Sequence, residues 1–191
     1  MINPKIMLSA ASMLAAGSLL VGATYAYFSD QGTSNDNVFA TGTLDLKLSD
    51  DTPETDQDSV TASFGGTNLK PGDSASGQLR LKNTGTIAAN HAEVALANTN
   101  SDQTYPLDKM LEITTLTYDE TSILPADVNQ NGWVDLDDLE SAELDNLALT
   151  DLNTNHPLNL TVQFRSGAGN EYQGDNVSSN WTVTLNQDTS Q

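Results

Sequence analysis

The chain has 191 residues, a formal net charge of −19 and no cysteine. This length allows one domain of about 150 residues plus a targeting segment, and the absence of cysteine excludes disulfide frameworks, thiol catalysis and thiolate metal sites. The acidic balance excludes a nucleic-acid-binding protein, because phosphate contacts need clustered Lys and Arg side chains. It fits a solvated surface, adaptation to high salt or binding of divalent cations.

Residues 1–26 have the three parts of a cleavable secretory signal peptide. Lys5 supplies the positive charge, an apolar run follows, and a small residue, Ala26, ends the segment. We therefore predict cleavage by a signal peptidase between Ala26 and Tyr27, which leaves residues 27–191 as a single domain outside the cell and free of the membrane. A retained membrane anchor is the alternative, but the run is at the lower length limit for spanning and no basic cluster follows it.

The mature chain is predicted to be all-β, as an antiparallel jelly-roll-like sandwich with a short helical insertion. Leu44, Leu46 and Leu48 alternate with polar residues, which is typical of a half-buried strand. Similar short alternations recur between turns rich in Gly, Asn and Asp, and one such turn places Pro71 before Gly72. The predicted strands are residues 38–48, 60–64, 78–82, 92–97 (with helix as the alternative), 111–118, 158–164 and 181–185.

Residues 135–149 break this alternation. Leu136, Leu139, Leu144 and Leu147 lie near helical spacing, which predicts a short helix or a pair of helices. Together with the loop that precedes it, this segment is interpreted as an insertion in the sandwich over residues 126–149.

Residues 127–138 fit the twelve-residue loop that binds Ca²⁺ in EF-hand proteins. Oxygen donors occupy alternate positions, and Gly132 falls at the sixth position, where the chain turns sharply. The predicted ligands are the side chains of Asp127, Asn129, Asn131, Asp135 and Asp138 and the backbone carbonyl of Trp133. Asp in place of the usual Glu at the last position resembles dockerin repeats, although the second loop of a dockerin is missing. The loop is predicted to hold structural Ca²⁺, with an ion-free acidic turn as the alternative.

The sequence contains no familiar catalytic motif. HExxH, GxSxG and the P-loop are all absent. The two histidines, His91 and His156, are far apart in the sequence, and each is interpreted as a surface or turn residue. No catalytic residue is therefore assigned.

Several short motifs resemble the TasA/camelysin family and occur in the same order. Their positions are 27–30 (YFSD), 39–46 (FATGTLDL), 69–73 (LKPGD), 162–164 (VQF) and 171–174 (EYQG). The opening motif is the specific one, whereas LKPGD alone is not. The calcium loop looks like an addition relative to the bacterial fibre proteins of the family.

The resemblance implies an extracellular fibre protein. TasA-like members, and archaeal bundling pili similar to them, form fibres of the biofilm matrix in which each subunit donates its N-terminal segment as a strand to the next. Here the donor would be residues 27–39, with Tyr27, Phe28, Val38 and Phe39 as its apolar anchors. Such a head-to-tail contact makes the chain a structural, non-enzymatic homopolymer of the cell surface.

Two other functions stay open. Camelysin-like members are described as metalloproteases, but two separate histidines do not provide a zinc triad. A monomeric surface domain that binds carbohydrate would use Trp133, Trp181 and the tyrosines as a platform, although packing is the commoner use of such residues.

Overall fold

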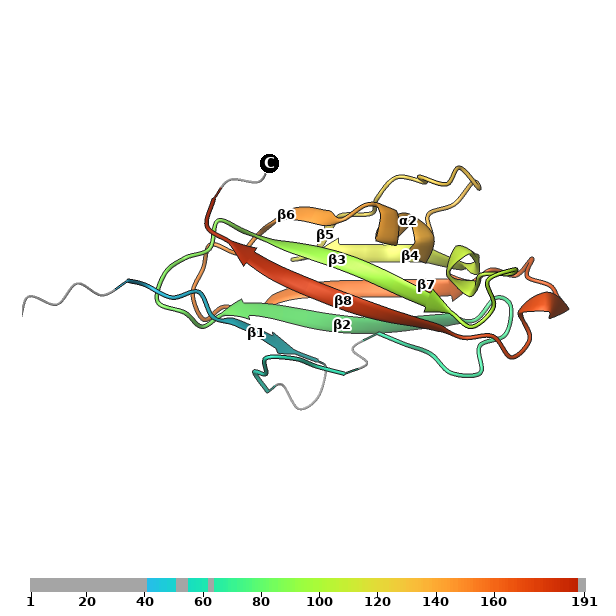
Figure 1. Ribbon diagram of the computed structural model, residues 1–191, viewed down its shortest axis with the longest axis horizontal. Helices are drawn as coiled ribbons and strands as arrows, with labels where there is room; N and C mark the ends of the chain where they lie inside the picture. Colours follow the sequence, from blue (N-terminus) through green and yellow to red (C-terminus); the bar gives the residue numbers. More distant parts are fainter. Residues whose placement is uncertain (1–40, 51–54, 62–63, 189–191) are drawn as a thin grey trace, which may run out of the picture. The chain divides into compact units, whose positions relative to one another are not determined.

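The computed structural model describes residues 41–50, 55–61 and 64–188, which belong to one compact unit, Thr41–Gln191. Within them, two antiparallel sheets pack face to face (Figure 1), so the predicted all-β sandwich is confirmed. The sheets have the strand orders β1-β2-β7-β4-β5 and β6-β3-β8. The strands are β1 (Leu46–Ser49), β2 (Ser74–Asn83), β3 (His91–Asn100), β4 (Leu111–Tyr118), β5 (Thr121–Ser122), β6 (Leu144–Ala148), β7 (His156–Phe164) and β8 (Val177–Asn186).

Helical structure in the described residues is limited to one short α-helix and two 3₁₀ turns. The α-helix is α2 (Leu136–Ser141), and the 3₁₀ turns are η1 (Leu107–Met110) and η2 (Asn170–Tyr172). None of these helices has the length and apolarity needed to cross a membrane.

The hydrophobic core lies between the sheets and follows the period-2 alternation of the strands. In β7 every second residue from Leu158 to Phe164 is buried, and in β3 the buried apolar residues are Ala92, Val94 and Leu96. Each large apolar side chain removed from water in this way contributes about 1.5–3 kcal/mol. The core therefore fixes which face of each strand points outward.

Two strand predictions near the start of the described residues are wrong in extent. Residues 41–45 are not a strand, because their backbone instead pairs irregularly with the turn after β2, where the Thr86 N–H donates to the Thr43 carbonyl at 2.8 Å. Val60 and Phe64 also lie outside strands, and Phe64 packs against Trp181 in a tilted arrangement with ring centroids 4.7 Å apart. The other five predicted strands are confirmed.

The predicted helix over residues 135–149 is right only in its first half. Leu136 and Leu139 lie on α2, but Leu144 and Leu147 belong to strand β6. The spacing of three between the two buried leucines of β6 comes from a β-bulge, which leaves two exposed residues between them. The bulge therefore gives the leucines of this strand the spacing that is expected of a helix.

The predicted turn before β2 is confirmed. The Asp73 N–H donates to the Lys70 carbonyl at 2.9 Å, and Gly72 has a φ of 97°. A positive φ at the third position is what a type II turn requires, and glycine adopts it without strain.

Candidate cation-binding loop

The predicted calcium loop connects strand β5 to helix α2. Its last residues are anchored on β4, because the Ile113 N–H donates to the Val134 carbonyl at 2.8 Å and Glu112 forms a bridge pair with Asp135. Asp135 then serves as the N-cap of α2. The last residues of the loop are thus held by both a sheet and a helix.

The first half of the loop turns in the way that the sequence predicted. Gly132 has a φ of 100°, and the carboxylate of Asp127 accepts from the backbone N–H groups of Asn131 at 3.2 Å and Gly132 at 2.8 Å. These bonds wrap the backbone around the Asp127 side chain. The glycine is required here for its backbone conformation, because a Cβ would meet nothing within 4 Å.

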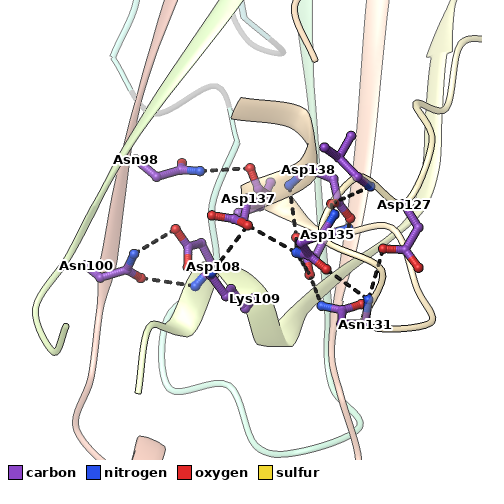
Figure 2. Close-up of polar contacts among 12 residues, drawn as sticks. Asn98, Asn100, Asp108, Lys109, Asp127, Asn131, Asp135, Asp137 and Asp138 are labelled. Carbon is purple, nitrogen blue, oxygen red and sulfur yellow. Dashed lines mark hydrogen bonds and ion pairs between the residues drawn. The ribbon is translucent and has the colours of Figure 1, made fainter. Parts of the chain in front are cut away.

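Three of the predicted ligands converge on one point. The Asn131 amide nitrogen lies 2.7 Å from Asp135 Oδ2 (Figure 2). The Asn129 amide nitrogen lies 3.3 Å from the same oxygen. Alternate side chains of the loop therefore face the same side, as an ion-binding coil requires.

Asp135 and Asp138 are completely buried, with exposed fractions of 0%. They form a capping box in which the Asp138 N–H donates to Asp135 Oδ1 and the Asp135 N–H donates to Asp138 Oδ2, both at 3.0 Å. Asp138 Oδ1 also accepts from the N–H groups of Val128 and Asn129 at 2.9 Å. Burial raises the pKa of Asp135, against the hydrogen bonds that lower it. A cation beside these carboxylates would offset that cost of burial.

The side chain of Trp133 fastens the loop to neighbouring elements. Its indole N–H donates to the Lys109 carbonyl at 3.0 Å, and the Arg165 guanidinium lies 3.6 Å from its ring centroid. Arg165 in turn pairs with Glu112 of β4. The Trp133 side chain is thus occupied in packing, which leaves its backbone carbonyl as the predicted ligand group.

Three carboxylates in or beside the loop were not predicted from the sequence. Asp137 Oδ2 accepts from the Asn129 amide at 3.1 Å and lies 3.5 Å from Lys109 Nζ. Asp137 also groups with Asp108 and Glu140, with one oxygen of each within 4.8 Å of the others. The acidic run over residues 135–140 was a signal for Asp137 and Glu140, but Asp108 comes from η1, and only the fold brings it there.

Asp108 links this region to strand β3. Its Oδ2 accepts from the Asn100 amide at 2.7 Å, and its N–H donates to Asn100 Oδ1 at 3.1 Å (Figure 2). Burial raises the pKa of Asp108, and the nearby charges of Asp137 and Glu140 raise it further. Negative charge is therefore concentrated on both sides of α2.

The donor set of the loop consists of oxygen atoms only. Carboxylate, amide and carbonyl oxygens suit a hard cation such as Ca²⁺, which takes six to eight of them, and do not suit Zn²⁺, which prefers nitrogen or sulfur. The residues present thus fit the predicted type of ion.

The two histidines lie on strands, away from this loop. His91 is the first residue of β3 and only 3% exposed, so its interpretation as a surface or turn residue is wrong. Its Nε2 lies 3.1 Å from Glu93 Oε1. His156 begins β7, and its Nδ1 lies 2.7 Å from Asp119 Oδ2.

Comparison with protein families gives one full-length match. The model of the camelysin metallo-endopeptidases matches residues 1–191. The chain belongs to the camelysin family. The resemblance drawn from the short motifs is therefore confirmed, and members of the camelysin family are secreted or cell-surface proteins. No curated protein matches the chain.

The name of the camelysin family implies a metal ion, and the described residues offer candidate ligands for one. They contain three groups of side chains close enough to share an ion, and within this part of the chain only the group of His91, Glu93 and Asp145 includes a nitrogen donor. The other two groups are entirely acidic and lie around α2. The first group fits a transition metal, whereas the acidic ones fit hard cations.

The remaining predicted residues lie outside the described part of the chain. They are those of the signal cleavage site and the donor segment, namely Ala26, Tyr27, Phe28, Val38 and Phe39.

Proposed function

We propose that this camelysin-family chain is the secreted subunit of an extracellular fibre or pilus, assembled by donor-strand exchange. The observation that carries the proposal is a sheet edge that no other described strand pairs, beside an apolar groove. In this arrangement residues 27–39 of one copy add a strand to the sandwich of the next, and the contact repeats head to tail into a filament.

The unpaired edge belongs to strand β8. Among the described residues β8 pairs with β3 alone, since the sheet order is β6-β3-β8. The inward residues of β8, such as Val177, Trp181 and Val183, are only half-buried, whereas those of β3 are buried. A further strand beside β8 would cover them and satisfy its backbone groups.

The groove beside this edge is large enough for the side chains of an added strand. Its volume is about 770 Å³, and its walls come from β8, β2, β7 and the loops around them. The walls include the apolar side chains of Phe64, Leu107, Leu160, Phe164, Tyr172 and Trp181. Aromatic anchors suit such walls, because rings bury much apolar area at low entropic cost.

The donor has the reach that the edge requires. Strand β8 has ten residues and spans about 33 Å, while residues 27–39 would span about 43 Å when extended. Tyr27 and Phe28 at one end and Val38 and Phe39 at the other can therefore reach opposite ends of the groove. Cleavage after Ala26 would free the end of the donor.

Calcium has a structural part in this proposal. Ca²⁺ bound by Asp127, Asn129, Asn131, Trp133, Asp135 and Asp138 would hold the loop between β5 and α2. Since Asp135 and Asp138 are buried beside each other, the ion would stabilise the subunit in which the groove is formed.

Electron microscopy of the chain starting at Tyr27 tests the assembly directly. We expect uniform fibres from residues 27–191 and monomers from residues 40–191, which lack the donor. A peptide of residues 27–39 added to the shorter chain should bind it one to one. Fibres formed by residues 40–191 would refute donor-strand exchange, and monomers of both lengths at every salt and Ca²⁺ concentration would refute self-assembly.

The family description favours a second candidate function, metallo-endopeptidase activity. The matching test is casein cleavage by the purified chain with and without a zinc chelator. Cleavage that the chelator abolishes would establish this function, whereas fibre growth should be insensitive to a chelator that spares Ca²⁺.

A further inference from the structure

A second cluster of metal-binding side chains lies on the outer face of the three-stranded sheet. His91 and Glu93 are two residues apart on β3 and share the face opposite to buried Ala92 and Val94. Asp145 faces them from the neighbouring strand β6, and the three side chains each offer one atom within 4.8 Å of the others. The cluster is separate from the calcium loop.

The β-bulge in β6 brings the third side chain into place. Ala92 pairs with Leu147 and Val94 with Leu144, so two residues of β6 stand opposite Glu93 alone. One of the two is Asp145, whose oxygen lies 3.8 Å from Nε2 of His91. Bulges redirect side chains in this way and are frequent next to functional sites.

The distances suit ligands of a single small ion. Ligand atoms about 2.0–2.1 Å from a tetrahedral ion are about 3.3 Å from one another. Nε2 of His91 lies 3.1 Å from Glu93 Oε1 and 3.8 Å from Asp145 Oδ1. One of these distances is slightly shorter than the tetrahedral value and the other is slightly longer. Only small movements would be needed to place an ion between the three atoms.

The surroundings of His91 also suit a metal ligand. The side chain is 3% exposed, and its Nδ1 lies 3.3 Å from Asn90 Oδ1. A hydrogen bond donated by Nδ1 leaves the lone pair on Nε2, the nitrogen that faces the carboxylates, and this is the usual support of a metal-bound histidine. The Asn186 amide nitrogen, 3.4 Å from Nε2, is a donor to the same lone pair, so a bound ion would displace this contact.

We propose that His91, Glu93 and Asp145 bind a divalent transition metal ion such as Zn²⁺. One imidazole nitrogen with two carboxylate oxygens suits such ions, whereas Ca²⁺ takes oxygen ligands alone. The metal implied by the family name is a second, independent reason to assign an ion to the group that contains the nitrogen donor. The site does not depend on fibre assembly, because all three ligands belong to one subunit.

Cobalt titration of the purified full chain tests this site. Excess Ca²⁺ is kept present to saturate oxygen-only sites, and Co²⁺ binding is followed by its visible absorption, which reports nitrogen and oxygen ligation. We expect one Co²⁺ per chain, displaced by one equivalent of Zn²⁺. Glu93→Gln and Asp145→Asn, which keep side-chain size, should each weaken binding about tenfold or more.

His156→Asn is the matched control, because this histidine also pairs with an aspartate but lies on β7. It should bind Co²⁺ as the unaltered chain does, whereas His91→Asn should lose the absorption bands. If His91→Asn fails to fold, the two carboxylate variants decide. The proposal would be overturned if the unaltered chain bound no Co²⁺ or if both carboxylate variants bound it as well as the unaltered chain does. It would also be overturned if His156→Asn lost as much Co²⁺ binding as His91→Asn. The cluster would then be only a contact between a histidine and two carboxylates.

Discussion

Gly132 is the residue on which the shape of the candidate calcium loop depends most directly. Its φ of 100° lies in the left-handed region, and its N–H donates to Asp127 Oδ2 at 2.8 Å. Residues with a Cβ adopt this region at a cost of about 1–2 kcal/mol. Glycine is therefore needed at this position for its backbone conformation and not because a side chain would lack space.

We expect Gly132→Ala to lower the free energy of unfolding by about 1–2 kcal/mol and to weaken ion binding by the loop. Urea unfolding measures the first effect. Terbium luminescence excited through Trp133, a predicted ligand residue, measures the second. Gly65→Ala is the control, because Gly65 has open space around it and no positive φ. Equal effects in both variants would contradict this account of Gly132.

Tyr118 makes stability depend on pH in the alkaline range. Its buried hydroxyl donates to the Ala148 carbonyl at 2.8 Å, and burial raises the pKa of this phenol above the usual value near 10. The folded chain thus favours the neutral phenol. The stability that this contributes is complete below about pH 10 and is lost as pH rises through the pKa of the folded state.

We expect Tyr118→Phe to cost about 0.5–1.5 kcal/mol at neutral pH, because the hydrogen bond is lost. The variant should also lose less stability than the unaltered chain between pH 9 and pH 11, which urea unfolding across this range would measure. Tyr105→Phe, at a residue 46% exposed, should keep the original pH dependence. An unchanged alkaline slope in Tyr118→Phe would contradict the assignment.

In strand β6, one added residue changes the alternation of buried and exposed side chains. The bulge places exposed Asp145 and Asn146 between buried Leu144 and Leu147, and Asn146 has a φ of 57°. Asparagine tolerates this left-handed conformation better than most residues. The bulge keeps both leucines in the core while it turns Asp145 toward His91.

We expect deletion of Asn146 to preserve the sheet, since Leu144 and Leu147 would then alternate regularly and still face inward. This deletion should lower the free energy of unfolding, as measured in urea, only slightly. It should also reduce Co²⁺ binding, because the direction of the Asp145 side chain changes. Deletion of both Asp145 and Asn146 should turn one leucine outward and cost about 1.5–3 kcal/mol more. Similar stability of the two deletions would contradict the register.

Regular strands were predictable from the sequence, whereas interruptions of their pattern were not. Residues 111–118 alternate clearly enough to give the bounds of β4, although it too contains a bulge. For β6 the sequence misled, because a bulge and a helix both place apolar residues three apart. The residues of the candidate calcium loop could be grouped from the sequence because they lie within twelve residues, but Asp108 and the pair of Glu93 and Asp145 reach their places only through the fold.

For the whole molecule, the net charge of −19 opposes folding through self-repulsion. Salt shortens the screening length from about 30 Å at 0.01 M to about 3 Å at 1 M. We expect the melting temperature to rise steadily with NaCl, both in saturating Ca²⁺ and in a Ca²⁺ chelator. If the melting temperature instead rises with NaCl only in saturating Ca²⁺ and not in the chelator, the stabilising effect of salt would belong to the calcium-bound loop and not to the acidic surface as a whole.

The edge of β8 that no other described strand pairs gives a second prediction for the whole molecule. Val177 lines the groove, whereas the adjacent Ser178 is exposed on the opposite face of the strand. We expect Val177→Lys to reduce fibre growth about tenfold or more, because a donor would have to bury an unpaired charge. Ser178→Lys adds the same charge and should leave growth unchanged, as followed by light scattering. Equal inhibition by both variants would attribute the effect to charge alone.

The walls of the groove come from residues as far apart in the sequence as Phe64 and Trp181. Translation and export proceed from the N-terminus, so residues 27–39 leave the ribosome long before β8 does. A growing chain can therefore offer its own strand at a time when it has no place to receive one. Under the proposed donor-strand exchange, a chain could therefore join a fibre as a donor before it could accept the next subunit.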